Sequence, residues 1–231
     1  MKPVEINLEK LKNIPFFSVI DDDTMAELTE IITFRKYRKG MLIFVEGEIG
    51  DAFYFVKTGL VKLSKTMEDG REQVLHFVKD GDIFAEILLF DKGPYPATAE
   101  VMKDSEIGII RNSELENFLL DHPQATMQIL IVMSKRLRQA QQQIRDLALY
   151  STFDRLIATF LKLAREYGVK TNKGVKINLA LGQQDIANMI GSSRETVARF
   201  MADLKKSKTI LVEKQYITIT DENKLLNWLL K

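Results

Sequence analysis

The sequence predicts an α+β protein with an N-terminal antiparallel β-roll or jelly roll, a long helix and a C-terminal winged helix-turn-helix. Seven of the 12 glycines lie between Gly40 and Gly93, about ten residues apart, which is typical of short strands joined by turns. Glycine is then absent from Ile109 to Tyr167, where apolar residues follow a helical period. Residues 1–149 carry a net charge of −5, whereas residues 150–231 carry 14 Lys and Arg against 8 Asp and Glu, a net charge of +6. The basic C-terminal third predicts a module that binds an acidic partner, with nucleic acid as the first candidate. The alternative is that these charges only form a solvated surface.

The composition limits the class of protein. With 231 residues the chain holds one large domain or two modest ones, and its hydrophobic fraction of 45% and charged fraction of 28% are ordinary for a globular protein. The absence of cysteine excludes disulfides, iron–sulfur clusters, thiolate zinc sites and cysteine nucleophiles. No apolar run approaches the roughly 20 residues of a membrane span, and charges interrupt residues 1–20, unlike a signal peptide. We therefore expect a cytoplasmic protein with no membrane partner.

The N-terminal roll is predicted from segments with the length and alternation of strands. A helix over residues 21–32 leads into it. Asp69–Gly70 is typical of a hairpin turn, because aspartate and glycine tolerate positive φ. The predicted strands are Met41–Val45, Phe53–Val56, Val61–Ser64, Gln73–Val78, Ile83–Ala85, Ala97–Val101 and Ile107–Arg111.

One long helix is predicted from Pro123 to about Leu149. Proline is tolerated in a first helical turn, where the N–H it lacks would have no intrahelical partner. Six residues follow the spacing of a coiled-coil seam: Leu130, Met133, Leu137, Ala140, Ile144 and Leu147. We expect this dimerisation helix to join two copies of the chain; the alternative is an amphipathic helix that packs on its own roll.

The C-terminal third begins with a predicted helix over residues 153–167, closed by Gly168. A polar loop is expected over residues 168–174. Near the end of the chain, residues 210–212 and 216–220 are rich in β-forming side chains and predict a small ribbon.

Between these elements lies a predicted helix-turn-helix. A first helix over residues 183–189 is ended by Gly191, which can adopt the left-handed conformation. Ser192 and Glu195 match the S-x-x-E capping box that begins a second helix. The buried stripe of the second helix is expected at Val197, Phe200, Met201 and Leu204.

The exposed start of the second helix carries residue types that read bases. Arginine can donate two hydrogen bonds to guanine O6 and N7, and glutamate can accept one from cytosine N4. The alternative is a solvated face on which Glu195 serves only as a cap. The predicted DNA-binding residues are Ser193, Arg194, Glu195, Thr196, Arg199, Gln183, Gln184 and Lys214.

These motifs resemble those of the CRP/FNR regulators. Gln183–Ala187 and Ser193–Arg199 are similar to the winged helix of that superfamily, and Gly59–Leu63, Asp80–Glu86 and Leu88–Phe90 are similar to its cyclic-nucleotide-binding roll. The resemblance covers essentially the whole chain. It implies an effector domain over residues 1–122, a dimerisation helix and hinge over 123–150, and a DNA-binding domain over 151–231.

The resemblance also implies partners. They are a second copy of the chain, double-stranded promoter DNA with a palindromic site, and RNA polymerase. Arg194, Glu195 and Arg199 match the branch of the family whose half-site resembles TGTGA. An effector in the roll would control DNA binding through the long helix.

The phosphate-binding part of the roll departs from the cyclic-AMP branch. Glu86, which in that branch binds the ribose, is retained, but Pro96 and Ala97 replace the arginine and serine that hold the phosphate. Ala140 and Gln141 replace the adenine-contacting Thr-Ser pair of the long helix. Because a buried phosphate needs a cation, cyclic AMP is not expected to bind. An apolar effector, or none, fits better.

The identity of any effector or cofactor is left open. The haem branch of the family uses a histidine where this chain has Ile87, but His76 keeps a haem- or other His-dependent sensor as an alternative to a histidine that only packs. The effector-pocket residues that the resemblance implies are His76, Ala85, Glu86, Ile87, Leu88, Pro96, Ala97, Thr98, Leu137, Ala140 and Gln141.

An enzyme is not expected from this sequence. It contains no G-x-S-x-G, H-E-x-x-H, Walker-type or dinucleotide-binding motif, and its two histidines are 46 residues apart. A cyclic-nucleotide-binding regulatory protein without DNA binding is a further alternative. Pro96 and the basic winged helix count against it.

Overall fold

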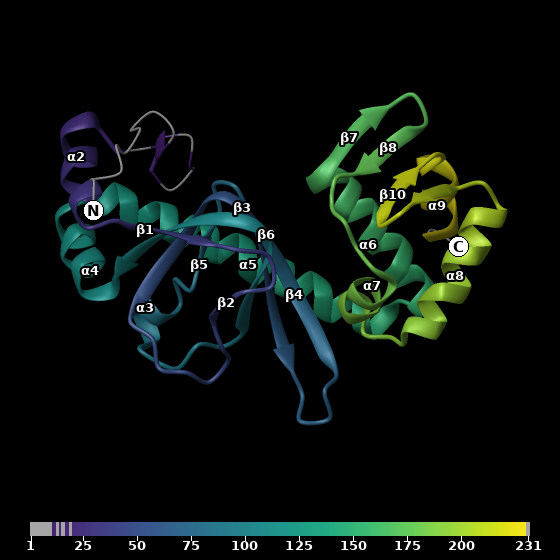
Figure 1. Ribbon diagram of the computed structural model, residues 1–231, viewed down its shortest axis with the longest axis horizontal. Helices are drawn as coiled ribbons and strands as arrows, with labels where there is room; N and C mark the ends of the chain where they lie inside the picture. The colour runs from purple at the N-terminus through teal and green to yellow at the C-terminus, as the bar shows by residue number, and fades with distance from the viewer. Residues whose placement is uncertain (1–10, 13, 15–16, 19, 230–231) are drawn as a thin grey trace. The chain divides into compact units, whose positions relative to one another are not determined.

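The computed structural model describes residues 11–12, 14, 17–18 and 20–229 (Figure 1). Contacts divide the chain into two compact units: residues 1–68 with 74–138, and residues 69–73 with 139–231. Among the described helices, none is long and apolar enough to cross a membrane. The α+β class is confirmed, with an antiparallel roll in the first unit and a helix-turn-helix with a ribbon in the second.

The first unit contains a six-stranded sheet. Its strands are β1 (Thr33–Tyr37), β2 (Leu42–Phe44), β3 (Ala52–Thr66), β4 (Glu72–Lys79), β5 (Ile83–Phe84) and β6 (Thr98–Arg111). The order is β1-β6-β3-β4, with β2 on β6 and β5 on β3. β6 pairs antiparallel with β1, β2 and β3. The two long strands, β3 and β6, therefore form the centre of the roll (Figure 1).

The predicted strands 53–56 and 61–64 are one continuous strand, β3, and 97–101 with 107–111 form β6. The sequence prediction placed a break near Gly59, but the chain passes this point with a shifted register instead of turning. Gly59 has φ +124°, and a Cβ there would lie 1.9 Å from Ser105 Oγ. Glycine is therefore needed for the close approach of the two strands, not for a turn.

Aromatic rings fill the interior of the roll. Phe44 is stacked on Tyr95 with ring centroids 3.8 Å apart, and Tyr54 is stacked on Phe84 at 5.2 Å. The hydroxyls of Tyr54 and Tyr95 lie 3.1 Å apart in a hydrogen bond. Burial raises the pKa of Tyr54, so this hydroxyl stays neutral. Gly50 makes room for the stack, because a Cβ there would lie 2.1 Å from the Tyr95 ring.

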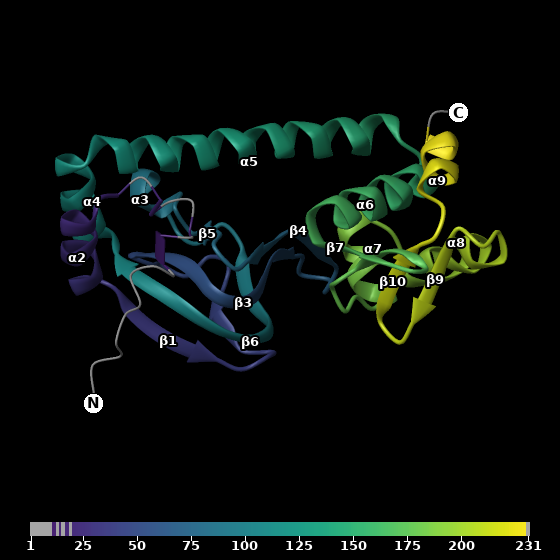
Figure 2. The ribbon, with the colours of Figure 1, turned by 90° about the horizontal axis from the view of Figure 1, so that it is seen from above.

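The helices that belong to or begin in the described part of this unit include α2 (Asp22–Glu30), α3 (Leu88–Asp91), α4 (Asn112–Asp121) and α5 (Pro123–Leu149). The bounds of α5 are those predicted, and the helix is uninterrupted (Figure 2). The sequence analysis did not predict α4. It buries Leu115, Phe118 and Leu119 in an apolar cluster with the start of α5, where Ile129 is fully buried. That cluster, and not local propensity alone, stabilises α4.

The second unit packs four helices and a four-stranded sheet. Its elements are α6 (Thr152–Tyr167), β7 (Gly168–Thr171), β8 (Gly174–Ile177), α7 (Gln183–Ile190), α8 (Arg194–Lys206), β9 (Ile210–Glu213), β10 (Tyr216–Ile219) and α9 (Glu222–Leu229). The sheet order is β7-β8-β10-β9. The prediction of a polar loop over residues 168–174 was wrong, because β7 and β8 form a hairpin that extends the ribbon.

Three aromatic rings join the helices of this unit. Phe153 of α6 lies 5.1 Å from Phe200 of α8 and 5.9 Å from Trp228 of α9, between ring centroids. Phe200 is only half-buried, so it lies at the edge of the stripe predicted for α8, whereas Val197, Met201 and Leu204 are fully buried. The helix α9 was not predicted.

Candidate functional site

The turn of the helix-turn-helix has the predicted glycine. Gly191 lies in the left-handed region, with φ 61° and ψ 56°, and its N–H bonds to the carbonyl of Ala187. The N–H of Ser192 also donates to Ala187 O, at 3.0 Å. Both bonds share the carbonyl of Ala187 in the last turn of α7, and they fix the path of the chain into α8.

The cap of α8 differs from the prediction. The N-cap is Ser193, whose Oγ accepts a hydrogen bond from the N–H of Thr196 at 3.2 Å. The predicted box between Ser192 and Glu195 is wrong, because the helix begins one residue later. Hydrogen bonds from its own backbone N–H and from Ser193 lower the pKa of Glu195. Glu195 is therefore an exposed, ionised acceptor at the start of the helix.

A groove of about 380 Å³ runs beside α8 in the second unit. Its walls come from the start of α7, from α8 and from the β9–β10 turn. The lining residues are Leu181, Gly182, Gln183, Gln184, Arg194, Met201, Lys205, Val212, Lys214 and Gln215. The groove thus brings together four of the predicted DNA-binding residues from three separate elements.

Backbone geometry positions these side chains. The N–H of Gly182 donates to Asp185 Oδ2 at 2.8 Å, which fixes the first turn of α7 below the groove. Lys214 has φ 58°, so it projects from a tight turn between β9 and β10. Lys205 was not predicted; its signal is its position in the last turn of α8, four residues after Met201 and so on the same helix face.

The remaining predicted DNA-binding residues lie outside the groove lining. Ser193, Glu195 and Arg199 are exposed on α8, and Thr196 is half-buried through its part in the cap. The guanidinium carbon of Arg199 lies 5.4 Å from the centroid of the Phe200 ring. The first turns of α8 therefore present two arginines and one carboxylate to the exterior of the unit.

In the roll, Glu86 is engaged by a residue that the sequence analysis did not assign. Arg136 of α5 donates to Glu86 Oε1 and also to the carbonyl of Ile83. The Glu86 side chain is only 5% exposed and that of Arg136 25% exposed. The signal for Arg136 was its place three residues after Met133, on the face of α5 that packs on the roll.

The backbone before Glu86 is strained. Ala85 is buried and has φ 61°, a conformation that residues other than glycine adopt at a cost. Glu86 Oε2 is buried and has no hydrogen-bond partner among the described residues. Leu88 is fully buried beside it, whereas Ile87 is 38% exposed.

Pro96 and Ala97 stand where the resemblance places the two phosphate ligands, and neither supplies a cation. Pro96 is exposed, Ala97 is buried, and Thr98 Oγ1 accepts a hydrogen bond from the N–H of Glu46 at 3.0 Å. Lys92 is 74% exposed, and its Nζ lies 3.5 Å from Glu116. Pro96 is thus exposed, whereas the neighbouring Tyr95 is buried and its ring stacks on Phe44.

The predicted seam of α5 is mostly exposed. Leu130, Leu137, Ile144 and Leu147 have exposed fractions of 46%, 63%, 68% and 56%. Met133 differs, since it packs against the buried cluster at the start of α5. Ala140 and Gln141 are exposed as well.

His76 lies on β4 and is half-buried. Across the described residues, no group of three His, Asp or Glu side chains could hold a metal ion.

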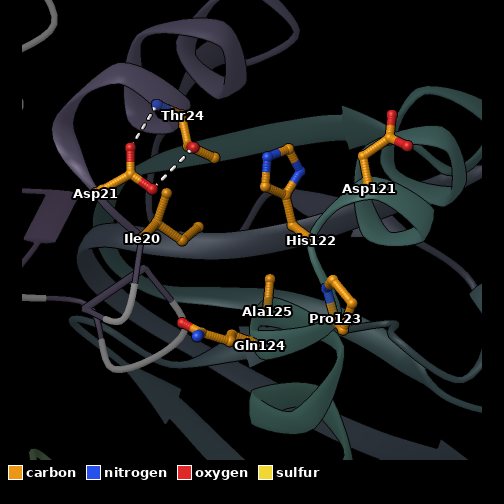
Figure 3. Close-up of a pocket in the computed structure, with 8 residues that line it drawn as sticks. All are labelled: Ile20, Asp21, Thr24, Asp121, His122, Pro123, Gln124 and Ala125. Atoms are coloured by element: carbon orange, nitrogen blue, oxygen red, sulfur yellow. Dashed lines mark hydrogen bonds between the residues drawn. The ribbon is translucent and has the colours of Figure 1, made fainter.

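A separate cavity of about 250 Å³ lies at the start of α2 and the α4–α5 junction (Figure 3). Asp21 accepts hydrogen bonds there from Thr24 N at 3.0 Å and Thr24 Oγ1 at 2.9 Å. His122 is half-buried: its ring is stacked on Phe118 at 4.2 Å, and its Nδ1 lies 2.7 Å from Phe118 O. None of the predicted effector-pocket residues lines this cavity.

Comparison with known proteins agrees with this geometry. Residues 34–122 match the cyclic nucleotide-binding domain, and residues 154–228 match the Crp-like helix-turn-helix domain. The chain is 33% identical over 196 residues to the anaerobic regulatory protein of Bacillus subtilis, covering 84% of this chain and 82% of that protein. It is 29% identical over 217 residues to the CRP-like cAMP-activated global transcriptional regulator of Mycobacterium tuberculosis, covering 94% and 97%.

Solved structures show the same fold. FixK2 from Bradyrhizobium japonicum matches with a TM-score of 0.75 at 25% identity, covering 85% of this chain and 96% of that one. A CooA mutant from Carboxydothermus hydrogenoformans matches with a TM-score of 0.79 at 22% identity, covering 97% and 96%. The fold and the helix-turn-helix define a DNA-binding transcription regulator. The chain belongs to the CRP/FNR family, whose members are transcription regulators and not enzymes.

Proposed function

We propose that the chain is a homodimer that binds a palindromic, TGTGA-like promoter site with α8 as its recognition helix. The observation that carries this proposal is the groove that gathers Gln183, Gln184, Arg194 and Lys214 from three elements. A groove with basic and amide side chains beside the start of a recognition helix suits a duplex, whose phosphates attract cations while its base edges are read in the major groove.

Each group has a distinct task in this proposal. Arg194 and Arg199 donate to guanines, and Glu195 accepts from the cytosine of a G·C pair. Lys214 and Lys205 contact phosphates. The exposed, ionised state of Glu195 supports its part, because a protonated carboxyl would be a weaker acceptor.

The exposed seam of α5 supports the homodimer. Four large apolar side chains at heptad spacing would remain in water in a monomer, and burying each is worth roughly 1.5–3 kcal/mol. Two copies of the recognition helix would match a two-fold-symmetric site. The proposal includes an effector domain over residues 1–122, a dimerisation helix and hinge over 123–150, and a DNA-binding domain over 151–231. It also includes RNA polymerase as a second partner and the cytoplasm as the location.

We also propose that cyclic AMP is not the effector. Support comes from the aromatic stack that includes Tyr95, from the outward position of Pro96, and from the pairing of Glu86 with Arg136. A neutral, apolar effector or a roll without an effector is consistent with this interior.

Three measurements test the proposal. Selection from a random duplex library at several salt concentrations should return a two-fold palindrome with TGTGA-like arms, bound more weakly as salt rises. A shift without sequence preference would contradict base reading by α8. Calorimetry with cyclic AMP should give no binding signal, and a micromolar dissociation constant would contradict the effector proposal. Native mass spectrometry of freshly purified protein would show any co-purified ligand, including haem.

A further inference from the structure

The junction between α5 and α6 is short and tightly bonded. α5 ends at Leu149 and α6 begins at Thr152, so only Tyr150 and Ser151 separate them. Ser151 Oγ accepts from the N–H of Asp154 at 3.2 Å, and Asp154 Oδ2 accepts from the N–H of Ser151 at 3.1 Å. This reciprocal capping fixes the start of α6.

One side chain ties this junction to the helix-turn-helix. The half-buried guanidinium of Arg155 donates from Nε to the carbonyl of Ile190 at 2.9 Å and from Nη1 to the carbonyl of Tyr150 at 3.0 Å. Nη2 lies 3.4 Å from Thr152 Oγ1. The planar guanidinium therefore contacts three acceptors, one each in the junction, in α6 and in α7.

The acceptor on α7 lies directly before the turn. Ile190 is the last residue of α7, is 2% exposed, and precedes Gly191. Terminal carbonyls of a helix have no intrahelical partner, and a cation there is favoured by the helix dipole. Only Gly191, Ser192 and Ser193 separate this bond from Arg194, the first residue of the recognition helix.

We propose that Arg155 is a positioning residue for DNA reading: it holds the α5–α6 junction against the turn, so that α8 is presented at one angle. The inference rests on the proposed binding of a palindrome by a homodimer. Two reading heads must match half-sites separated by a fixed number of base pairs. Freedom at this junction would let each head tilt and accept other separations. Lysine cannot replace arginine here, because it lacks the planar fork that reaches two carbonyls at once.

The test measures discrimination between spacings as well as affinity. Wild type, Arg155→Lys and the matched control Arg165→Lys, an exposed arginine of the same helix, are compared on palindromes with the centre lengthened or shortened by one and two base pairs. Wild type and Arg165→Lys should prefer one spacing by about tenfold or more. In Arg155→Lys the preference should fall to about threefold or less, with about tenfold weaker binding at the best spacing.

A second variant and a second readout protect the test from a folding defect. Thr152→Val removes only the weakest of the three acceptors and should reduce the preference in the same direction by a smaller factor. Hydrogen exchange should quicken at the amides of Tyr150 and Ser192 in Arg155→Lys, while the amides of β9 and β10 keep their protection.

The outcomes separate this inference from the proposed function. Wild-type preference retained in Arg155→Lys, or affinity lost equally at every spacing, would overturn the positioning role and leave DNA binding intact. Failure of wild type and Arg165→Lys to select any palindrome would overturn the proposed function, and the inference with it.

Discussion

The second unit and the roll differ in where their charged side chains lie. On α8 and the β9–β10 turn, Arg194, Glu195 and Lys214 are exposed. In the roll, Glu86 and Arg136 are bonded to each other below the surface. A polyanion is bound by cations that remain in water until it arrives. In an ion pair, by contrast, the carboxylate neutralises the arginine and leaves little charge for an anionic ligand. The charged residues proposed to read DNA therefore follow the family pattern, whereas the charged residues of the effector region do not.

The largest expected effect is on the element shared by both units. Leu137→Glu places two carboxylates in the exposed seam of α5 and should remove roughly 3–6 kcal/mol of dimer stability, from two apolar side chains lost at the contact. Light scattering at micromolar concentration should show a monomer for the variant and a dimer for wild type. A monomeric wild type would instead indicate that the seam covers its own chain.

The buried pair of the roll gives the next largest effect. Glu86→Ala removes the carboxylate that pairs with Arg136. The free energy of unfolding should fall by about 3 kcal/mol, because the guanidinium of Arg136 is then left unpaired and poorly solvated. Lys92→Ala breaks an exposed pair and should change it by less than about 0.5 kcal/mol. Urea unfolding measures both. Equal effects would mean that the Glu86–Arg136 pair is no more buried in solution than the surface pair.

Base reading is tested by Arg194→Ala. Loss of a two-bond arginine–guanine contact should cost roughly 1–3 kcal/mol on the selected site and relax preference at one base pair in each half-site. Glu195→Ala should relax a different, G·C pair. Site selection with each variant beside wild type measures this. If Arg194→Ala returns the wild-type motif unchanged at every position, Arg194 does not read a base.

The smallest effect belongs to the ribbon turn. Lys214→Gln should weaken binding to all duplexes alike and reduce the slope of log K against log salt by about 1, as expected when one phosphate contact is lost. Lys170→Gln, on the exposed strand β7, is the matched control and should leave the slope near wild type. A change confined to one sequence would assign Lys214 to base reading instead.

Most of the fold could be predicted because local rules determined it. Pro123 placed the start of α5, and Gly191 placed the end of α7. The errors have a common cause: Gly59 allows two strands to touch, and β7 is stabilised by β8, so both depend on residues distant in the chain. Sequence periodicity reports neither kind of contact.

The candidate site was predictable where one motif carries it. Arg194, Glu195 and Arg199 lie on one short helix, so spacing alone places them together. Arg136 and Arg155 were missed because Glu86 and the Ile190 carbonyl, which accept from them, lie on other elements. Lys205 was missed because the groove that it lines is built from three elements. An isolated cation in a helix looks like a solvated charge until the fold brings other elements to it.

The aromatic triad of the second unit has a spectroscopic consequence. Trp228 is the only tryptophan in the chain, and it lies beside Phe153, which also contacts Phe200 of α8. Fluorescence excited at wavelengths that only tryptophan absorbs therefore originates from the second unit alone. The many tyrosines and phenylalanines of the roll do not contribute to it, so the protein carries a native optical label on its DNA-binding part.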